Sequence, residues 1–186
     1  METEPNQIPE KDYNIIEENS SRLNISTGIS KIIYKYNEFL TKHSQRRCLD
    51  KNSNDRINIE KENRAFLEEY WEVYQFITYW YGYYLNEGIG GDRDEKKAIK
   101  LFKQVANKNV SGAQLRYAFS FVKNNSLNRR DLSEFITYLS KSANNNNNKA
   151  QYEFGKLYYF GNLVSKDKEQ GKKFLILALK MITQKR

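Results

Sequence analysis

The sequence predicts an all-α protein built as a stacked array of helices. Three observations support this fold class. No proline follows Pro9 in the 186 residues, apolar residues recur at the spacing of one helix face, and three segments resemble one another. Gly82, Ala118 and Gly155 mark equivalent places in these segments, 36 and 37 residues apart. Self-similarity at this period is typical of helical repeats.

The start of the chain differs in charge from the remainder. Residues 1–19 carry six acids and one base, whereas the other residues carry 30 bases and 17 acids. Both prolines also lie in this acidic start. We therefore expect residues 1–12 to form a flexible tail. The tail lacks the basic beginning and apolar run of a signal peptide.

Two helices are expected before the repeats. Apolar residues at helical spacing predict a helix from Ile29 to about Lys42, which the polar residues 50–55 end. A second helix is predicted from Ile59 to about Asn86, apolar over a wide arc and so packed between neighbours. Residues 13–76 contain no clean repeat, and we expect them to cap the array, because terminal units of repeat proteins are atypical.

Residues 77–186 contain the repeats, with units of about 77–112, 113–149 and 150–186. In the first and third units two glycines are six residues apart and an aspartate follows. Small residues allow the first helix of a unit to approach its partner, and Gly88 and Gly90 suit a turn with positive φ. The expected N-caps of the second helices are Asp94, Asp131 and Asp167.

At these residues the chain resembles the Sel-one-like repeat (SLR), a relative of the tetratricopeptide repeat. The first copy matches the family pattern at Gly82, Gly88, Gly90, Asp94, Lys97, Ala98, Phe102 and Ala106. The third copy matches at Ala150, Gly155, Tyr158, Gly161, Val164, Asp167, Phe174 and Ala178. The middle copy keeps Ala113, Ala118, Phe121, Asp131 and Ala143, but Asn124 and Ser126 replace its turn glycines.

The resemblance implies an α/α superhelical solenoid of helical hairpins, with about three SLR units and extra N-terminal packing helices. It also implies a non-catalytic scaffold or adaptor that binds one or more proteins. The resemblance does not identify the partner.

Positions that change between copies form the candidate protein-binding surface. They lie on the first helix of each unit, two residues before, one after and five after the small residue. Hypothetical protein-binding residues are therefore Trp80, Tyr83, Glu87, Arg116, Phe119, Lys123, Glu153, Lys156 and Phe160. Tryptophan, tyrosine and arginine are common interaction anchors. An open alternative is that Trp80 and Tyr83 pack on the N-terminal helices.

No catalytic, cofactor-binding or metal-binding residue is predicted. One cysteine and one histidine cannot supply a Cys/His zinc site. His43 and Cys48 lie in a polar stretch that we interpret as a solvated helix end. The glycines at 88–91 lack the lysine and hydroxyl residue of a phosphate-binding loop.

Two further functional hypotheses follow. The excess of bases outside the acidic start allows binding to nucleic acid or another anionic surface. Scattered placement of these bases over both helices makes this the weaker hypothesis. The other alternative is a regulatory module for a partner kinase.

Self-association through the C-terminal helix is also expected, because its apolar residues have no following repeat to cover them. No run is long enough to span a membrane, and a lone cysteine favours the cytoplasm, with the nucleus not excluded, over secretion.

Overall fold

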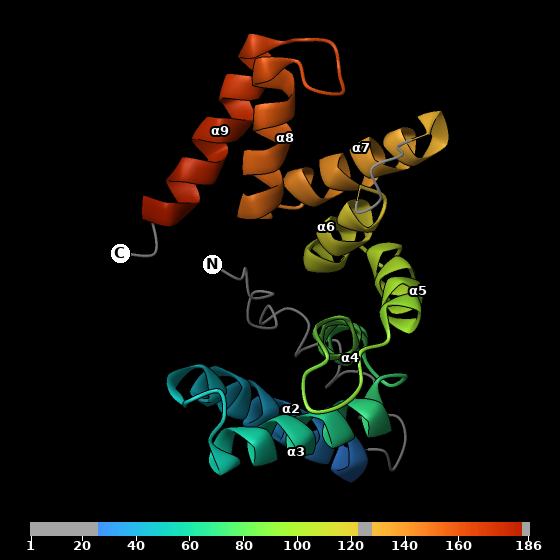
Figure 1. Cartoon of the computed structure of the whole chain (residues 1–186), viewed down its shortest axis with the longest axis vertical. Coiled ribbons are helices and arrows are strands. Elements are labelled where there is room, and N and C mark those ends of the chain that lie inside the picture. Colours follow the sequence, from blue (N-terminus) through green and yellow to red (C-terminus); the bar gives the residue numbers. More distant parts are fainter. Residues whose placement is uncertain (1–25, 123–127, 184–186) are drawn as a thin grey trace. The chain divides into compact units, whose positions relative to one another are not determined.

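The computed structural model describes residues 26–122 and 128–183, and none of these residues is in a β-strand. The helices divide between two compact units, Asn6–Ala98 and Ile99–Arg186, which we name the N-terminal unit and the C-terminal unit. Figure 1 shows the helices of both units, coloured in chain order. Within each, helices pack consecutively along the chain. The all-α class and the hairpin arrangement are therefore confirmed, whereas the expected tail, residues 1–12, lies outside the described residues.

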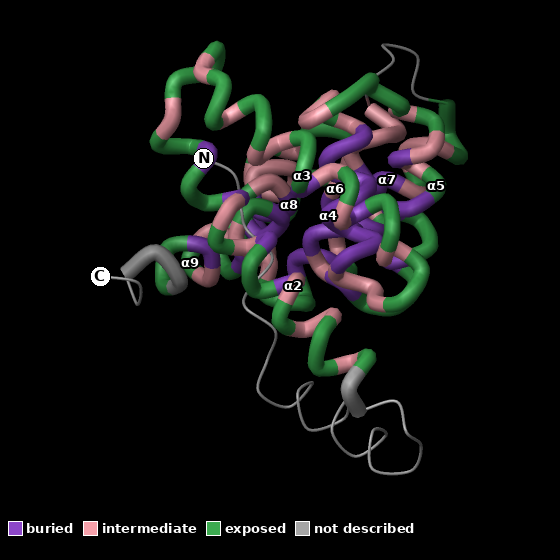
Figure 2. Tube along the Cα trace, turned by 90° about the horizontal axis from the view of Figure 1, so that it is seen from below, coloured by how far each residue is buried: buried purple, intermediate pink, exposed green. Residues whose placement is uncertain are grey.

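The N-terminal unit is a cluster of three helices. Its elements are α2 (Ser26–Gln45), the short 3-10 helix η1 (Arg46–Cys48), α3 (Asn54–Tyr70), α4 (Gln75–Glu87) and the first turn of α5 (Glu95–Ala106). Phe39 of α2 lies at the centre, with its ring centroid 5.9 Å from that of Phe66 and 5.5 Å from that of Trp80. Helix α4 buries nine consecutive residues, Ile77–Leu85, as its wide apolar arc predicts (Figure 2).

The prediction of one continuous helix over residues 59–86 is wrong. Helix α3 ends at Tyr70, and α4 begins at Gln75 after an extended Tyr74 with φ −146° and ψ 130°. The interruption contains neither glycine nor proline, so the usual sequence signals are missing. The Thr78 hydroxyl donates to the carbonyls of Trp71 and Tyr74, which satisfies backbone groups at the interruption.

The C-terminal unit continues the pattern of helical hairpins. It contains the rest of α5, then α6 (Ser111–Ser120), α7 (Arg129–Asn144), α8 (Asn148–Phe160) and α9 (Lys168–Thr183). Edge-to-face aromatic pairs join the helices of each hairpin. The ring centroids of Tyr117 and Tyr138 are 4.7 Å apart, and those of Phe154 and Phe174 are 4.8 Å apart. The same aromatic contact is thus repeated in successive hairpins.

A buried side chain ties each first helix to the helix before it. Gln114 donates from Nε2 to the Ala106 carbonyl at the end of α5, over 3.2 Å. Gln151 makes the equivalent bond to the Ala143 carbonyl in the last turn of α7, also over 3.2 Å. Thr78 is placed 36 residues before Gln114 and bonds the end of α3. The junction between α3 and α4 therefore resembles the junctions between repeats.

The turn glycines adopt the expected conformations. Gly88 and Gly161 end α4 and α8 with φ of 66° and 76°. Gly90 has φ of 70°, and a Cβ atom there would overlap the Glu60 carbonyl of α3. Glycine is therefore required at Gly90 for two separate reasons.

Two of the three expected N-caps are confirmed. Asp94 Oδ1 accepts from the Lys97 amide over 2.9 Å, and Asp167 Oδ1 accepts from the Gln170 amide over 3.0 Å. Asp131 is not the cap of α7. Asn128 takes that place, because its extended backbone precedes the helix and its Oδ1 accepts from the Asp131 amide over 2.8 Å.

Two glycines allow α8 and α9 to touch. A Cβ atom at Gly155 would lie 2.9 Å from Leu175 Cγ, which confirms the expected close approach. A Cβ atom at Gly171 would lie 2.6 Å from the backbone nitrogen of Tyr159. Sequence reasoning missed Gly171, because it lies outside the repeat pattern.

Candidate protein-binding surface

Trp80 and Tyr83 of the N-terminal unit face α2. Trp80 is only 4% exposed, and its ring centroid is 4.4 Å from that of His43. Tyr83 is also buried, with its ring centroid 6.0 Å from the same imidazole. These contacts correspond to the alternative that the sequence left open. Among the three candidates in this unit, Glu87 alone is exposed.

A polar cluster is buried beside these rings. His43 is buried, so its interpretation as part of a solvated helix end is wrong. Its Nδ1 accepts from Arg46 Nε over 3.3 Å and lies 2.9 Å from the Tyr84 hydroxyl. Asn63 Nδ2 donates to that hydroxyl over 3.1 Å, and Arg46 also pairs with Glu60 over 3.3 Å.

The hydrogen bonds of this cluster involve both His43 and Tyr84. Nδ1 of His43 lies within hydrogen-bond distance of Arg46 Nε and of the Tyr84 hydroxyl. Burial raises the pKa of Tyr84 to about 12, so its phenol stays protonated near neutral pH. The cluster therefore links polar side chains of α2, α3 and α4 in the core, and Tyr84 cannot act there as a base.

Arg116 and Phe119 of α6 are half-buried in the C-terminal unit. The Arg116 guanidinium lies 5.8 Å from the ring centroid of Phe102 in α5. The Phe119 ring centroid is 5.8 Å from that of Phe135 in α7. Both side chains thus contact neighbouring helices while keeping part of their surface accessible. Lys123 lies outside the described residues.

Helix α8 carries three of the candidate side chains, all at least partly accessible. Phe160 is 59% exposed, and Glu153 and Lys156 form a partly exposed ion pair of 3.4 Å. Tyr152, 48% exposed, shares the face, with its ring centroid 5.0 Å from Lys156 Nζ. Leu163, in the following turn, is 50% exposed. Tyr152, Lys156 and Phe160 are four residues apart and so lie on one helix face. We name these three residues, with Leu163 of the turn, the α8 stripe.

Sequence reasoning missed Tyr152 and Leu163. Tyr152 is equivalent to Tyr79 and Leu115. Because an apolar or aromatic residue occupies this position in every copy, the sequence indicates that the position is buried in the core. Tyr79 and Leu115 are indeed buried, whereas Tyr152 is not. The repeat pattern is apolar at all three positions and does not reveal this difference.

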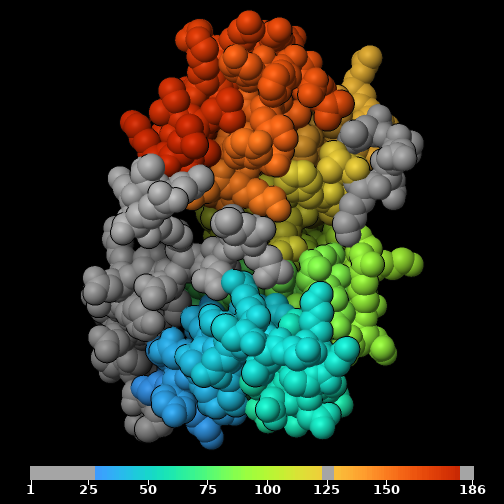
Figure 3. Space-filling view, turned by 60° about the vertical axis from the view of Figure 1, so that its left-hand side comes forward, coloured from blue at the N-terminus to red at the C-terminus, as the bar shows by residue number. Residues whose placement is uncertain are grey.

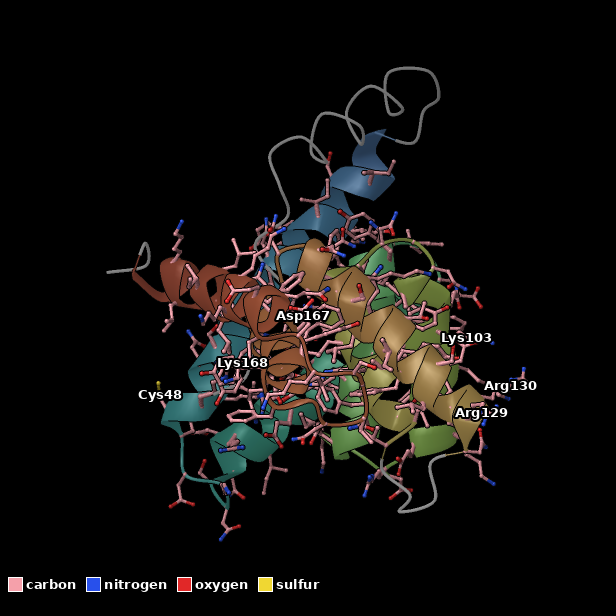
Figure 4. All side chains as sticks on the ribbon, turned by 90° about the horizontal axis from the view of Figure 1, so that it is seen from above. Cys48, Lys103, Arg129, Arg130, Asp167 and Lys168 are labelled. Carbon is pink, nitrogen blue, oxygen red and sulfur yellow. The ribbon has the colours of Figure 1, made fainter. Side chains whose placement is uncertain are left out.

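Positive charge is concentrated in the C-terminal unit. Residues 99–186 contain 17 bases and 5 acids, a net charge of +12, whereas residues 6–98 contain 14 bases and 16 acids, a net charge of −2. Lys103, Arg129 and Arg130 are exposed and extend away from the helices on one side of this unit (Figure 4). Lys103 Nζ lies 6.0 Å from the ring centroid of Tyr117, whose pKa is raised by burial.

Among residues 26–122 and 128–183, no three histidine, cysteine or acidic side chains are grouped as metal ligands. Over the same ranges, no helix has the length and apolarity needed to cross a membrane.

The repeated hairpins, left-handed glycine turns and buried glutamine junctions define a helical-repeat protein. The Sel1 repeat family matches residues 78–110 and 148–181, which contain the first and third copies. These two segments of the chain are therefore Sel1 repeats. A comparison with curated proteins gave no match.

A solved structure shows the same fold. A Sel1 repeat protein from Oxalobacter formigenes has 23% identity and a TM-score of 0.51, over 66% of this chain and 35% of that one. A protective antigen of uropathogenic Escherichia coli with an SLR fold has 18% identity and a TM-score of 0.39, over 63% of this chain and 33% of that one. The chain thus spans about a third of the length of these structures.

Proposed function

We propose that this protein is a non-catalytic cytoplasmic scaffold and that the α8 stripe contacts a partner protein. Sel1 repeats are typically protein-interaction modules. The observation that carries the proposal is the exposure of Tyr152 and Phe160 on α8 and of Leu163 in the turn that follows it. Exposed aromatic and aliphatic side chains that lie together are typical of interaction sites. Lys156 lies among them and would favour an acidic group at the edge of the contact.

The backbone at Leu163 supports the same assignment. Leu163 has φ of 64°, close to the 70° of Gly90, its equivalent in the first repeat. A left-handed conformation costs a residue with a Cβ atom about 1–2 kcal/mol. An exposed leucine therefore occupies a place where glycine would be less strained. A contact with a partner explains why a large apolar side chain occupies this position.

The test compares variants that separate binding from stability. Affinity capture followed by mass spectrometry first identifies a partner, and its dissociation constant is then measured with purified proteins. We expect Phe160→Ala and Leu163→Gly each to weaken binding by about tenfold, a loss typical of interaction anchors. Leu163→Gly should do so without lowering the melting temperature, because it relieves backbone strain.

Tyr34→Ala is the matched control. Tyr34 is an exposed aromatic residue of α2 that lies outside the α8 stripe. It should leave the dissociation constant unchanged. Unchanged binding by Phe160→Ala and Leu163→Gly would reject the α8 stripe as the contact. Trp80→Ala is unsuitable for this test, because Trp80 is part of the core.

Nucleic-acid binding is a second candidate, favoured by the net charge of +12 on residues 99–186. Titration with single-stranded RNA at two salt concentrations tests it. A nucleic-acid site predicts affinity that falls steeply with salt. It also predicts weaker binding by Lys103→Gln/Arg129→Gln/Arg130→Gln, with Lys51→Gln/Lys61→Gln/Arg93→Gln in the N-terminal unit as the control. No binding at the lower salt concentration would exclude this candidate.

A further inference from the structure

Helix α2 covers aromatic side chains of α4 within the N-terminal unit. Figure 3 shows α2 and α3, in blue and cyan, side by side at the surface of this unit. Trp80 and Tyr83 of α4 lie against His43 of α2, with ring centroids 4.4 and 6.0 Å from that of the imidazole. The indole nitrogen of Trp80 is buried and has no hydrogen-bond partner in the described structure, so burial alone protects its N–H group from water. Movement of α2 would therefore make both side chains accessible.

Positive charge beside His43 favours its neutral form. Nδ1 of His43 accepts from Arg46 Nε over 3.3 Å, and a protonated imidazole, with hydrogen on both nitrogens, would lose this bond. Glu60 Oε1 pairs with Arg46 over 3.3 Å and with Arg56 over 2.9 Å, so one carboxylate balances two guanidinium groups. The side chains of Arg46 and Glu60 are 6% and 18% exposed, so solvent screens these charges weakly. A proton on His43 would thus place a second cation against a cluster that already carries excess positive charge.

The other titratable groups around His43 do not change this balance at mildly acidic pH. The Tyr84 hydroxyl lies 2.9 Å from Nδ1, and burial raises the pKa of Tyr84 to about 12, so this phenol is uncharged. The two aromatic side chains of α4 described above contact the imidazole through their rings. Lys42, the next residue before His43 on α2, pairs with Glu38 and Glu62 over 2.9 and 3.0 Å at a partly exposed site. Protonation of the imidazole is therefore opposed by the neighbouring guanidinium and by burial.

We propose that α2 is an acid-sensitive cover, and that protonation of His43 loosens α2 and makes Trp80 and Tyr83 accessible. Histidine is the side chain whose ordinary charge change falls between pH 5 and 8. At neutral pH the uncharged imidazole packs between the aromatic rings and α2 stays in place. At mildly acidic pH the open form binds a proton that the closed form excludes, so the open form becomes more populated. This device lies within the N-terminal unit and is independent of the α8 stripe.

Hydrogen exchange on the full chain tests the cover. NMR measures the protection factors of the α2 backbone amides and of the Trp80 indole N–H at pH 7.5 and at pH 5.5. We expect both to fall by about tenfold, the factor for a histidine with an ordinary pKa of about 6.5 that binds its proton only in the open form. Amides of α6–α9 serve as the internal control and should keep their protection. Unchanged protection in α2, or an equal fall in α6–α9, would overturn the proposal.

Substitutions assign the effect to one side chain, because the chain contains a single histidine. His43→Asn keeps a polar group near the Nδ1 position but does not titrate, so its protection factors should be equal at the two pH values. Arg46→Met removes the adjacent cation and should make the fall smaller, because the protonated imidazole is then less opposed. The matched control Lys31→Met removes an exposed cation of α2 and should keep the tenfold fall. A tenfold fall that persists in His43→Asn or in Arg46→Met would overturn the proposal.

Discussion

Gln114 and Gln151 occupy equivalent positions but differ in their hydrogen bonds. Gln114 donates to the Ala106 carbonyl and to Asn109, and its Oε1 accepts from Asn145 over 2.9 Å. Gln151 donates to the Ala143 carbonyl, and its Oε1 has no hydrogen-bond partner within the described structure. The same residue type therefore stabilises two junctions to different extents.

Leucine substitutions should reveal this difference. Gln114→Leu leaves buried partners unsatisfied, and we expect it to lower the free energy of unfolding by about 1–3 kcal/mol. Gln151→Leu should cost less, because it breaks one bond and removes an unsatisfied oxygen. Urea unfolding of both variants measures the difference. Equal destabilisation, or a larger effect at Gln151, would show that the hydrogen bonds do not determine junction stability.

Tyr84 makes stability depend on pH in the alkaline range. Burial raises its pKa from 10.0 to about 12. The buried phenol therefore stays protonated at pH values where the unfolded chain releases the proton. Its stabilising contribution is complete below pH 10 and is lost as the pH rises towards 12. A shift of this size corresponds to about 3 kcal/mol in all.

Tyr84→Phe isolates this contribution from the other titrating groups. Unfolding free energies of the wild type and the variant are compared at pH 8 and at pH 11. We expect the advantage of the wild type to shrink by about 1.4 kcal/mol at pH 11, one unit above the ordinary pKa. A constant difference at both pH values would mean that Tyr84 ionises in the folded protein as readily as in the unfolded chain.

At the scale of elements, the hairpin of α8 and α9 depends on its two glycines. A Cβ atom at Gly171 would meet the backbone of Tyr159, which cannot move as a flexible side chain can. Gly171→Ala should therefore separate the helices and lower the melting temperature, with increased amide exchange in α8 and α9.

Gly28→Ala is the control for helix propensity. A Cβ atom at Gly28 of α2 would meet nothing within 4 Å. Alanine is favoured over glycine inside a helix by about 0.5–1 kcal/mol, so this variant should be slightly more stable. Similar stabilisation by Gly171→Ala would show that α8 and α9 do not need this close approach.

The sequence predicted elements best where one residue type has a single local role. Gly88, Gly90, Asp94 and Asp167 take the predicted conformations or caps, because turns and caps depend on nearby atoms. The α7 cap was missed, since α7 begins earlier in its unit than α5 and α9 do. Asn128 lies ten residues after Ala118, whereas Asp94 and Asp167 lie twelve residues after Gly82 and Gly155. The break between α3 and α4 was also missed, because no helix-breaking residue lies there. The break coincides with tertiary packing, which the sequence does not show.

The candidate surface was less predictable than the fold. Variation between copies identified Glu153, Lys156 and Phe160, which are at least partly accessible. The same criterion selected Trp80 and Tyr83, which are buried against α2. Variation between copies shows that a position does not take part in the packing contact that all copies share. It does not show whether another helix outside the repeats covers that position.

At the scale of the whole molecule, charge is unequally divided between the two units. The net charges are +12 for residues 99–186 and −2 for residues 6–98. Like charges within one unit repel each other, and salt screens that repulsion. We therefore expect added salt to stabilise α6–α9 more than α2–α4.

Hydrogen exchange at low salt and at 0.5 M sodium chloride tests this prediction. At 0.5 M the screening length lies between about 3 and 8 Å. Amides of α6–α9 should gain protection at the higher concentration, and amides of α2–α4 serve as the internal control. Equal gains in both units would attribute the effect to general salting-out instead of charge repulsion.

The buried junction side chains also affect how such a protein can lengthen or shorten during evolution. Thr78, Gln114 and Gln151 each lie on one helix and satisfy the end of the helix before it. A gene segment duplicated from one of these positions to the next would carry a complete set of donors and acceptors. Recombination in this register adds a hairpin without orphaning a buried carbonyl, whereas breakpoints in another register separate the donor from its acceptor.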